Sequence, residues 1–348
     1  MRILEKLQHS WVTVPPQVHK RIVAIISVLL FCNVFVWLYA IFASHTHPLI
    51  LGLVALAYGL GLRHAVDADH IAAIDNTTRK LMLDGKRPVA VGLFFSLGHS
   101  TIVTLLSIIV AFSSSFITHS LPTLQSTGTI IGTAVSGFFL LLIGFINLVA
   151  FLDILRVFRG VTKNKTYLKQ VTHNHLHTQG FLTRIFKPVL KTVSSSWHMY
   201  FIGFLFGLGF DTASEVGLLS ISAASGATGI SFWEILLLPL AFTAGMALID
   251  TIDGILMLGA YGWAYIKPVR KLYYNLNITF ISVIIALFIG SVEVIQLFTA
   301  KFNIHNSFFQ WISRLDLNKL GYMVIAIFIL SWAISLSIYK MKRYDQLT

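Results

Sequence analysis

Eight apolar runs, each about as long as a bilayer-spanning helix, constrain this chain more than any other feature. Such a helix needs about 20 predominantly apolar residues. The runs cover residues 22–43, 49–74, 89–113, 128–152, 197–223, 232–260, 274–299 and 320–339. Charged residues supply only 11% of the chain, against about 25% in globular proteins, which is too few for a water-facing surface. We therefore expect an all-α integral membrane protein with about eight transmembrane helices, and we exclude a soluble enzyme.

Lysine and arginine residues are distributed unevenly between the two sides of the predicted helices. Of the 26, 22 lie in the N-terminal arm or in the segments after the second, fourth, sixth and eighth runs. Lys301, Arg314 and Lys319 lie on the other side, and Arg63 lies within the second run. The positive-inside rule then places both termini in the cytoplasm, with residues 1–348 as one polytopic domain of the cytoplasmic (plasma) membrane. The net charge of +12 follows from this bias, so it does not indicate nucleic-acid binding.

The segment 153–196 is the one long connection between the predicted helices. It is basic, is expected in the cytoplasm, and contains His173, His175 and His177 in the run HNHLH. Alternating histidines can bind a transition metal weakly, but a solvated loop with scattered histidines explains them equally well. The single cysteine, Cys32, excludes an intrachain disulfide and a site built from several thiolates.

Acidic residues inside the apolar runs carry the functional argument. Each Asp at the centre of a membrane helix costs about 2.5–3.5 kcal/mol on an insertion scale, so such residues mark an ion or substrate path. Only one basic residue, Arg63, lies within the runs, so ion pairing alone cannot neutralise these acids, and a bound cation or proton is required. The acids within or at the edges of the runs are Asp67, Asp69, Asp75, Asp211, Glu215, Asp250, Asp253 and Glu293.

The second run combines histidine and aspartate in the sequence Arg63-His64-Ala65-Val66-Asp67-Ala68-Asp69-His70. At 100° per residue, His64, Asp67 and His70 share one helix face, whereas Asp69 points away unless the helix is interrupted. Two imidazoles and a carboxylate suit nickel, cobalt or zinc better than soft copper(I). The alternative is a buried network of ion pairs that holds helices together.

Three other runs add ionisable residues to this cluster. The third run contains His99, the fifth contains Asp211 and Glu215 four residues apart, and the sixth contains Asp250 and Asp253 three residues apart. Carboxylates at these spacings share a helix face and repel one another, which a cation or proton between them would relieve.

The second and fifth runs share a glycine pattern. Residues 58–62 (YGLGL) and 206–210 (FGLGF) match at an offset of 148 residues. A shift of three spans reverses the direction of crossing, as in the inverted repeats of secondary transporters. We therefore expect that spans two to four and five to seven form a pseudo-symmetric pair with the ion site between them.

Four motifs in four predicted helices resemble those of the nickel/cobalt transporter family. RHAVDADHI (Arg63–Ile71) resembles the family's H-x4-D-H signature, and LGHST (Leu97–Thr101), LGFDTASE (Leu208–Glu215) and GMALIDTID (Gly245–Asp253) resemble its other motifs in order. The fifth-helix motif more often reads FDTATE, so Ser214 is a departure that keeps both acids. The resemblance implies a secondary transporter, or permease, that takes up nickel or cobalt ions as substrates and needs no cofactor.

The resemblance also assigns roles to particular residues. His64, Asp69 and His70 match the signature, and the metal site is expected at His64, Asp67, Asp69, His70 and His99. The residues expected to line the path or support the ligands are Arg63, Asn33, Asp211, Glu215, Asp250 and Asp253. Asn33 is alternatively a helix-packing amide.

Three other functions compete with this one. A metal exporter would use the same ligands, and a carrier of zinc or manganese would use similar ones. An enzyme is disfavoured because neither HExxH nor GxSxG occurs, and the absence of a G-x-x-x-x-G-K-[ST] motif argues against direct use of ATP. Coupling to protons, the preference between nickel and cobalt, and the oligomeric state are left open.

Overall fold

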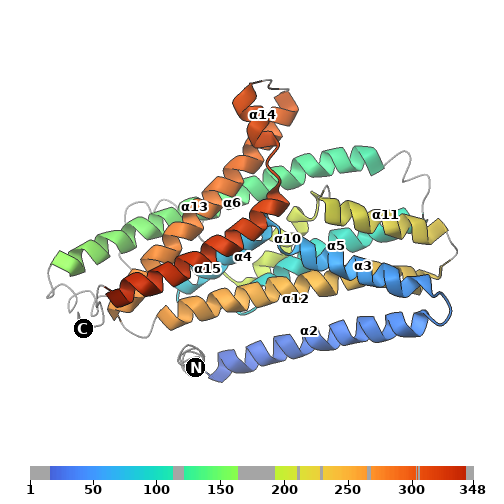
Figure 1. The fold of residues 1–348 in the computed structure, drawn as a ribbon, viewed down its shortest axis with the longest axis horizontal. Coiled ribbons are helices and arrows are strands. Elements are labelled where there is room, and N and C mark those ends of the chain that lie inside the picture. The colour runs from blue at the N-terminus through green and yellow to red at the C-terminus, as the bar shows by residue number, and fades with distance from the viewer. Residues whose placement is uncertain are drawn as a thin grey trace.

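A bundle of long helices makes up the computed structural model, which describes residues 16–112, 121–163, 193–209, 212–227, 230–264, 268–302, 304 and 306–341 (Figure 1). Five helices are long and apolar enough to cross a membrane. They are α2 (Pro16–Ala43), α5 (Val91–Phe112), α6 (Leu121–Lys163), α12 (Phe232–Ala264) and α13 (Pro268–Phe302). No strand occurs in the described ranges. The prediction of an all-α, multi-span membrane protein is confirmed, while the count of eight spans stays a prediction.

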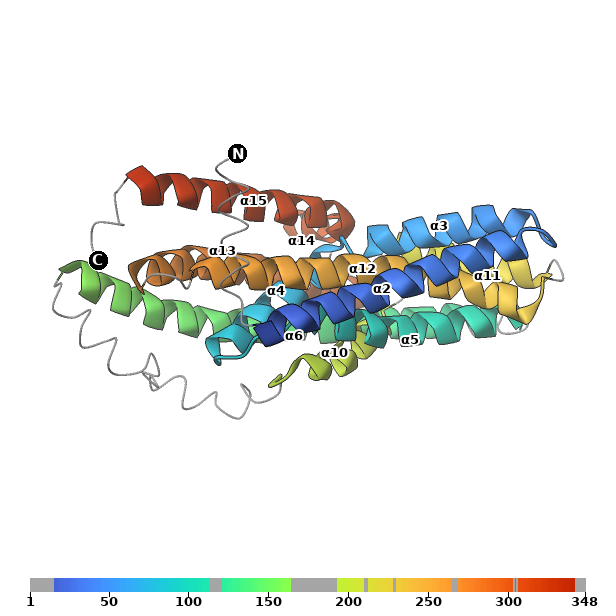
Figure 2. The same cartoon turned by 90° about the horizontal axis from the view of Figure 1, so that it is seen from below.

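The remaining helices are shorter or less apolar. α3 (Leu49–His64) and α4 (Ala68–Leu83) would form a sixth span if counted together. The chain also forms the 3-10 turn η2 (Ser196–His198), α10 (Met199–Phe206), α11 (Ala213–Ala227), α14 (Ser307–Ser313) and α15 (Leu317–Met341). Figure 1 shows α2 along the edge of the bundle beside α12, and in Figure 2, seen from below, α2 lies in front of α12.

The second span is broken, so the run 49–74 contains the interruption that the sequence left open. α3 and α4 meet at an angle of 55° across residues 65–67. Asp67 has an extended backbone (φ −67°, ψ 144°) and is the N-cap of α4, a position that Asp favours. Asp69 therefore lies in the first turn of α4 and not on the far side of a helix that continues from α3.

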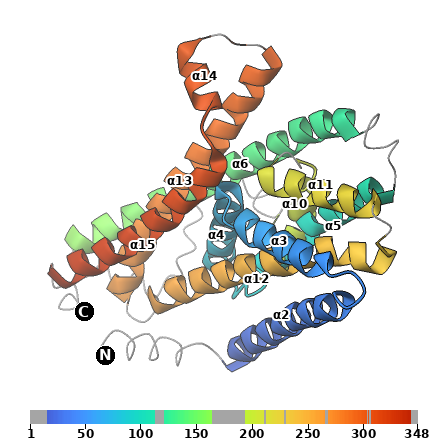
Figure 3. The same ribbon diagram turned by 45° about the vertical axis from the view of Figure 1, so that its right-hand side comes forward.

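α4 is enclosed by the rest of the bundle. It lies among α6, α12, α13 and α15 (Figure 3), and every residue from His70 to Met82 is buried. Arg79 and Lys80, expected in a cytoplasmic loop, are instead buried in this helix, where Arg79 donates to the hydroxyl of Thr279 on α13. Because the apolar pattern ends at residue 74, it did not predict that the helix continues to Leu83.

The fifth span is also broken. α10 ends at Phe206 and α11 begins at Ala213, whereas the sequence predicted one run over 197–223. Asp211 lies outside the described residues, as do His173, His175 and His177. The long connection is shorter than expected, because α6 continues to Lys163.

Two of the close helix contacts through glycine match each other. α3 crosses α12 where Gly61 lies against the backbone of Phe242, and Gly245 lies against the backbone of Tyr58. A Cβ at either glycine would overlap the facing main chain, so these helices approach closely only because no side chain is present.

The second of these contacts has the same residue pattern as the first, but it joins a different pair of helices. α10 crosses α5 where Gly203 lies against the backbone of Phe95, and Gly98 lies against the backbone of Tyr200. The two crossings share Tyr-x-x-Gly on one helix and Phe-x-x-Gly on the other. These contacts support a repeat: they relate Gly61 to Gly203, an offset of 142, and Gly98 to Gly245, an offset of 147, beside the predicted offset of 148.

Candidate metal centre

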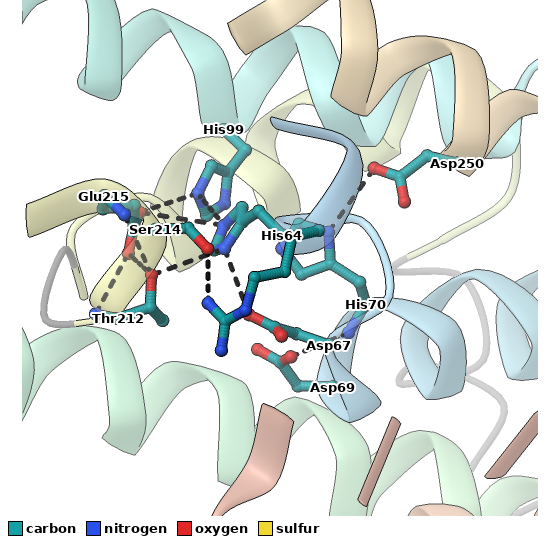
Figure 4. Close-up of polar contacts among 10 residues, drawn as sticks. His64, Asp67, Asp69, His70, His99, Thr212, Ser214, Glu215 and Asp250 are labelled. Carbon is teal, nitrogen blue, oxygen red and sulfur yellow. Dashed lines mark hydrogen bonds and ion pairs between the residues drawn. The ribbon is translucent and has the colours of Figure 1, made fainter. Parts of the chain in front are cut away.

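Three buried histidines from three helices meet at the break between α3 and α4 (Figure 4). His64 ends α3, His70 lies in the first turn of α4, and His99 lies midway along α5. Their ring centroids are 4.7 Å (His64–His70), 4.8 Å (His64–His99) and 5.0 Å (His70–His99) apart. One nitrogen from each ring can be chosen so that all lie within 4.8 Å of one another. The three rings can therefore point lone pairs at a single ion.

Glu215 of α11 adds a carboxylate to the histidines. Its Oε1 lies 2.9 Å from His99 Nε2 and 3.9 Å from His64 Nε2, and these two nitrogens are 3.0 Å apart. Metal–nitrogen bonds of about 2.0–2.1 Å place neighbouring ligand atoms about 2.8–3.4 Å apart. Two of the three distances are in that range, and the third needs only a small side-chain movement.

Carboxylates also lie next to the Nδ1 atoms of two of the histidine rings. Asp67 Oδ2 is 3.1 Å from His64 Nδ1, and Asp250 Oδ2 is 3.4 Å from His70 Nδ1. The Ser96 hydroxyl donates to the same Asp250 oxygen at 2.6 Å. A carboxylate in this position fixes the orientation of a metal-binding imidazole and directs its other nitrogen toward the ion.

The centre is enclosed by aromatic side chains. Phe95 packs edge-on against His70 with centroids 4.7 Å apart, and Phe242 lies 5.5 Å from His64. His64, His70 and His99 are at most 3% exposed. His70 Nε2 is buried and has no hydrogen-bond partner in the described residues, so its lone pair or proton is uncompensated. An ion at the centre would satisfy it.

Carboxylates outnumber cationic side chains around the centre. Asp67, Glu215 and Asp250 are within 4 Å of a histidine nitrogen, whereas the one nearby guanidinium, that of Arg63, donates to Ser214 at 2.6 Å. With neutral histidines this surplus favours a cation. The donor set of imidazole and carboxylate, without sulfur, suits a divalent ion such as nickel, cobalt or zinc.

The other residues predicted from the sequence lie around this centre. Asp69 accepts from the backbone N–H of His70 at 2.9 Å. Asn33 donates to the carbonyls of Leu29 and Ala244, which joins α2 to α12. Asp253 interacts electrostatically with Asp75 and Asp250.

Sequence reasoning missed three neighbours of the histidines. Thr212 Oγ1 donates to Glu215 Oε2 at 2.7 Å and lies 3.4 Å from His64 Nδ1. Thr212 is inside the motif LGFDTASE, and Ser96 precedes His99 by three residues on the same helix face, so both had a signal in the sequence. Phe242 had none, because an apolar residue in an apolar run has no distinguishing pattern.

Known proteins share this sequence over most of its length. Residues 50–338 match the family described as high-affinity nickel-transport protein. The chain is 48% identical to the high-affinity nickel transport protein of Cupriavidus necator over 93% of both chains, and 45% identical to the high-affinity nickel-transport protein NixA of Helicobacter pylori over 83% of this chain and 88% of the relative. It is 41% identical to the cobalt transport protein NhlF of Rhodococcus rhodochrous over 81% of both chains. No solved structure matches. The resemblance seen in the four motifs is thereby confirmed, and the chain belongs to the high-affinity nickel-transport protein family.

Proposed function

We propose that this protein is a permease that takes up nickel or cobalt ions across the cytoplasmic membrane, and that the three-histidine centre binds the ion during transport. The observation that carries the proposal is the convergence of three buried imidazoles and Glu215 on one point within the helix bundle. The names of the relatives from Cupriavidus necator and Rhodococcus rhodochrous support nickel and cobalt as substrates.

We assign the ligand atoms to His64, His70, His99 and Glu215. Asp67 and Asp250 orient His64 and His70 rather than bind the ion themselves, because each lies at the outer nitrogen of its ring. This assignment changes three roles expected from the sequence: Asp67 and Asp69 are no longer ligands, and Glu215 moves from path to ligand.

The transport path continues along α4 toward the cytoplasm. Asp75, Asn76, Thr77 and Thr78 are all fully buried, so this helix provides a polar lining in the interior of an apolar bundle. Asp253 of α12 interacts electrostatically both with Asp75 of this lining and with Asp250 beside His70. Carboxylates along the route would stabilise a divalent ion after it leaves the histidines.

The membrane potential is sufficient to drive uptake. Each elementary charge gains about 2.3 kcal/mol per 100 mV, so a divalent ion gains about 4.6 kcal/mol, or more than about a thousandfold accumulation. Coupling to protons is therefore optional. The carboxylates near Asp253 could carry a proton outward in exchange, which uptake measured at several external pH values would reveal.

The test is uptake of radiolabelled nickel and cobalt at nanomolar concentration in cells that express the chain. We expect His64→Ala and His99→Ala to abolish uptake while the protein remains in the membrane at normal abundance. His45→Ala is the matched control, because this exposed histidine lies in the connection between α2 and α3. Loss of label from expressing cells would indicate an exporter, and full uptake in both variants would refute the site.

A further inference from the structure

A cleft at the cytoplasmic end of the bundle has no role in the proposed transport. Its volume is about 240 Å³, and it is bordered by α2, by the segment before α5 and by η2. Its polar lining is Arg21 of α2, Arg87, and Ser196 of η2, and its apolar lining includes Ile25 and Val89. It therefore joins three segments that are distant in sequence.

The polar lining is suited to an anion. Arg21 and Arg87 supply two guanidinium groups, and among the described residues none that lines the cleft is acidic. Arginine binds phosphate through paired N–H groups, and this geometry adds both strength and specificity. α5 begins at Val91, directly after two lining residues, so the unpaired N–H groups of its first turn contribute further positive potential.

The walls of the cleft are held in place by hydrogen bonds. Lys80, near the end of α4, donates to the carbonyl of Val193 at 2.8 Å, and Lys86 donates to the carbonyl of Ser194. These bonds fix the segment before Ser196 against the segment that contains Arg87. The cleft is thus built before any ligand arrives, which lowers the entropy that binding would cost.

The surroundings place the cleft at the level of lipid head groups. Trp197, next to Ser196, is 49% exposed and packs against Phe201, as expected of an aromatic residue at the membrane interface. Further along α2, Val28 and Phe35 lie on the same helix face as Arg21 and are 61% and 58% exposed. An acyl chain attached to a head group in the cleft would lie along this apolar face.

We propose that the cleft binds the phosphate of an anionic phospholipid of the cytoplasmic leaflet, with Arg21, Arg87 and Ser196 as its contacts. Basic pockets between helices on the cytoplasmic side bind lipid head groups in this way. The bound lipid bridges α2 to α5 and η2. α2 packs mainly on α12 and α3, so the lipid adds a third attachment for the helix at the edge of the bundle.

The test compares the purified full-length protein in nanodiscs of phosphatidylglycerol and of phosphatidylcholine. We expect phosphatidylglycerol to raise the melting temperature of the wild type by several degrees, and Arg21→Gln with Arg87→Gln to remove that rise. Arg314→Gln with Lys319→Gln is the control, because it removes two positive charges on the other side of the membrane and should leave the rise intact.

Three outcomes decide the proposal. The proposal would be overturned if phosphatidylglycerol raised the melting temperature of the wild type and of the Arg21/Arg87 variant equally. It would also be overturned if inorganic phosphate at millimolar concentration raised the melting temperature as much as the lipid does. If the glutamine variant does not fold, Arg21→Lys with Arg87→Lys keeps both charges. The lysine variant should fold and bind phosphatidylglycerol several-fold more weakly in native mass spectrometry, and unchanged binding would again contradict the site.

Discussion

His64 and His99 face each other through Nε2 atoms that are 3.0 Å apart, so at most one of these two nitrogens can carry a hydrogen between them. Glu215 Oε1, at 2.9 Å from His99, adds a negative charge to the same point. A divalent ion would replace the shared proton with three bonds to lone pairs. Of these three groups, only the Glu215 carboxylate would neutralise part of the charge of the ion. We therefore expect Glu215 to contribute most to the affinity for the ion.

Glu215→Gln should therefore weaken nickel binding by at least tenfold, because the amide keeps the size of the side chain but loses its charge. Isothermal titration of the purified protein with nickel measures this. Glu234→Gln is the matched control, since Glu234 is 6% exposed and is bound by Thr46 and His47 away from the centre. Equal affinity in the Glu215 variant and the wild type would remove Glu215 from the ligand set.

Asp250→Asn should weaken nickel binding about 10–100-fold, the range typical when a group that orients a metal-binding histidine is changed. The asparagine can still accept from Ser96 but no longer attracts the N–H of His70 as a carboxylate does. Asp253→Asn should instead slow uptake and leave binding unchanged, because Asp253 belongs to the path. Titration and uptake rates together separate the two roles, and loss of binding in Asp253→Asn would contradict the assignment.

At the scale of elements, the break at residues 65–67 brings the centre together. His64 and His70 are six residues apart, which is about 9 Å along an unbroken helix, too far for both to bind one ion through short side chains. The 55° bend reduces the distance between their ring centroids to 4.7 Å. The sequence predicted that these histidines act together, but it predicted the wrong geometry, because apolar periodicity assumes a continuous helix.

Glycine positions show what sequence reasoning could and could not predict. The glycine pattern of the second run contains both Gly59 and Gly61, yet only Gly61 lies against another backbone, that of Phe242. A Cβ at Gly59 would have open space within 4 Å. Which of two neighbouring glycines faces a partner depends on helix rotation, which is set by tertiary contacts that the local pattern does not contain.

Gly61→Ala should consequently destabilise the protein by about 1–3 kcal/mol, the usual cost of an added methyl group in a close-packed contact. Gly59→Ala should be neutral or stabilising by up to about 1 kcal/mol, because alanine favours a helix more than glycine does. Scanning fluorimetry in detergent measures the melting temperatures of both variants and so compares two positions of the same helix, α3. Equal melting temperatures would show that α3 and α12 are not in close contact at Gly61.

At the scale of the whole molecule, the three-histidine centre lies where the interrupted helix pairs α3–α4 and α10–α11 meet α5 (Figure 4). α3 and α4 supply His64 and His70, α11 supplies Glu215, and α5 supplies His99. The four sequence motifs predicted which helices take part, but not which atoms meet, because contacts between segments over a hundred residues apart leave no local pattern. All three histidines are at most 3% exposed, so this conformation is closed, and transport requires one side of the bundle to open.

The orientation of this bundle in the membrane decides which end of the proposed path meets the cytoplasm. The end that carries Lys80, Arg87 and the first turn of α2 is assigned to the cytoplasm by its basic residues. Thr46 and His47 bind Glu234 at the opposite end, where α2 meets α3 and α12 begins. A single reactive thiol at either end reports the orientation directly.

Substituting Cys32 by Ser leaves a chain without cysteine, to which His45→Cys or Asp84→Cys can be added. Both positions are exposed and lie at opposite ends of the span formed by α3 and α4. A membrane-impermeant maleimide should label His45→Cys in intact cells and Asp84→Cys only after permeabilisation, and Cys32→Ser alone should stay unlabelled. The reverse pattern would place the polar lining of α4 on the outside of the cell. The lining would then connect the histidines to the exterior, and the prediction that both termini lie in the cytoplasm would be wrong.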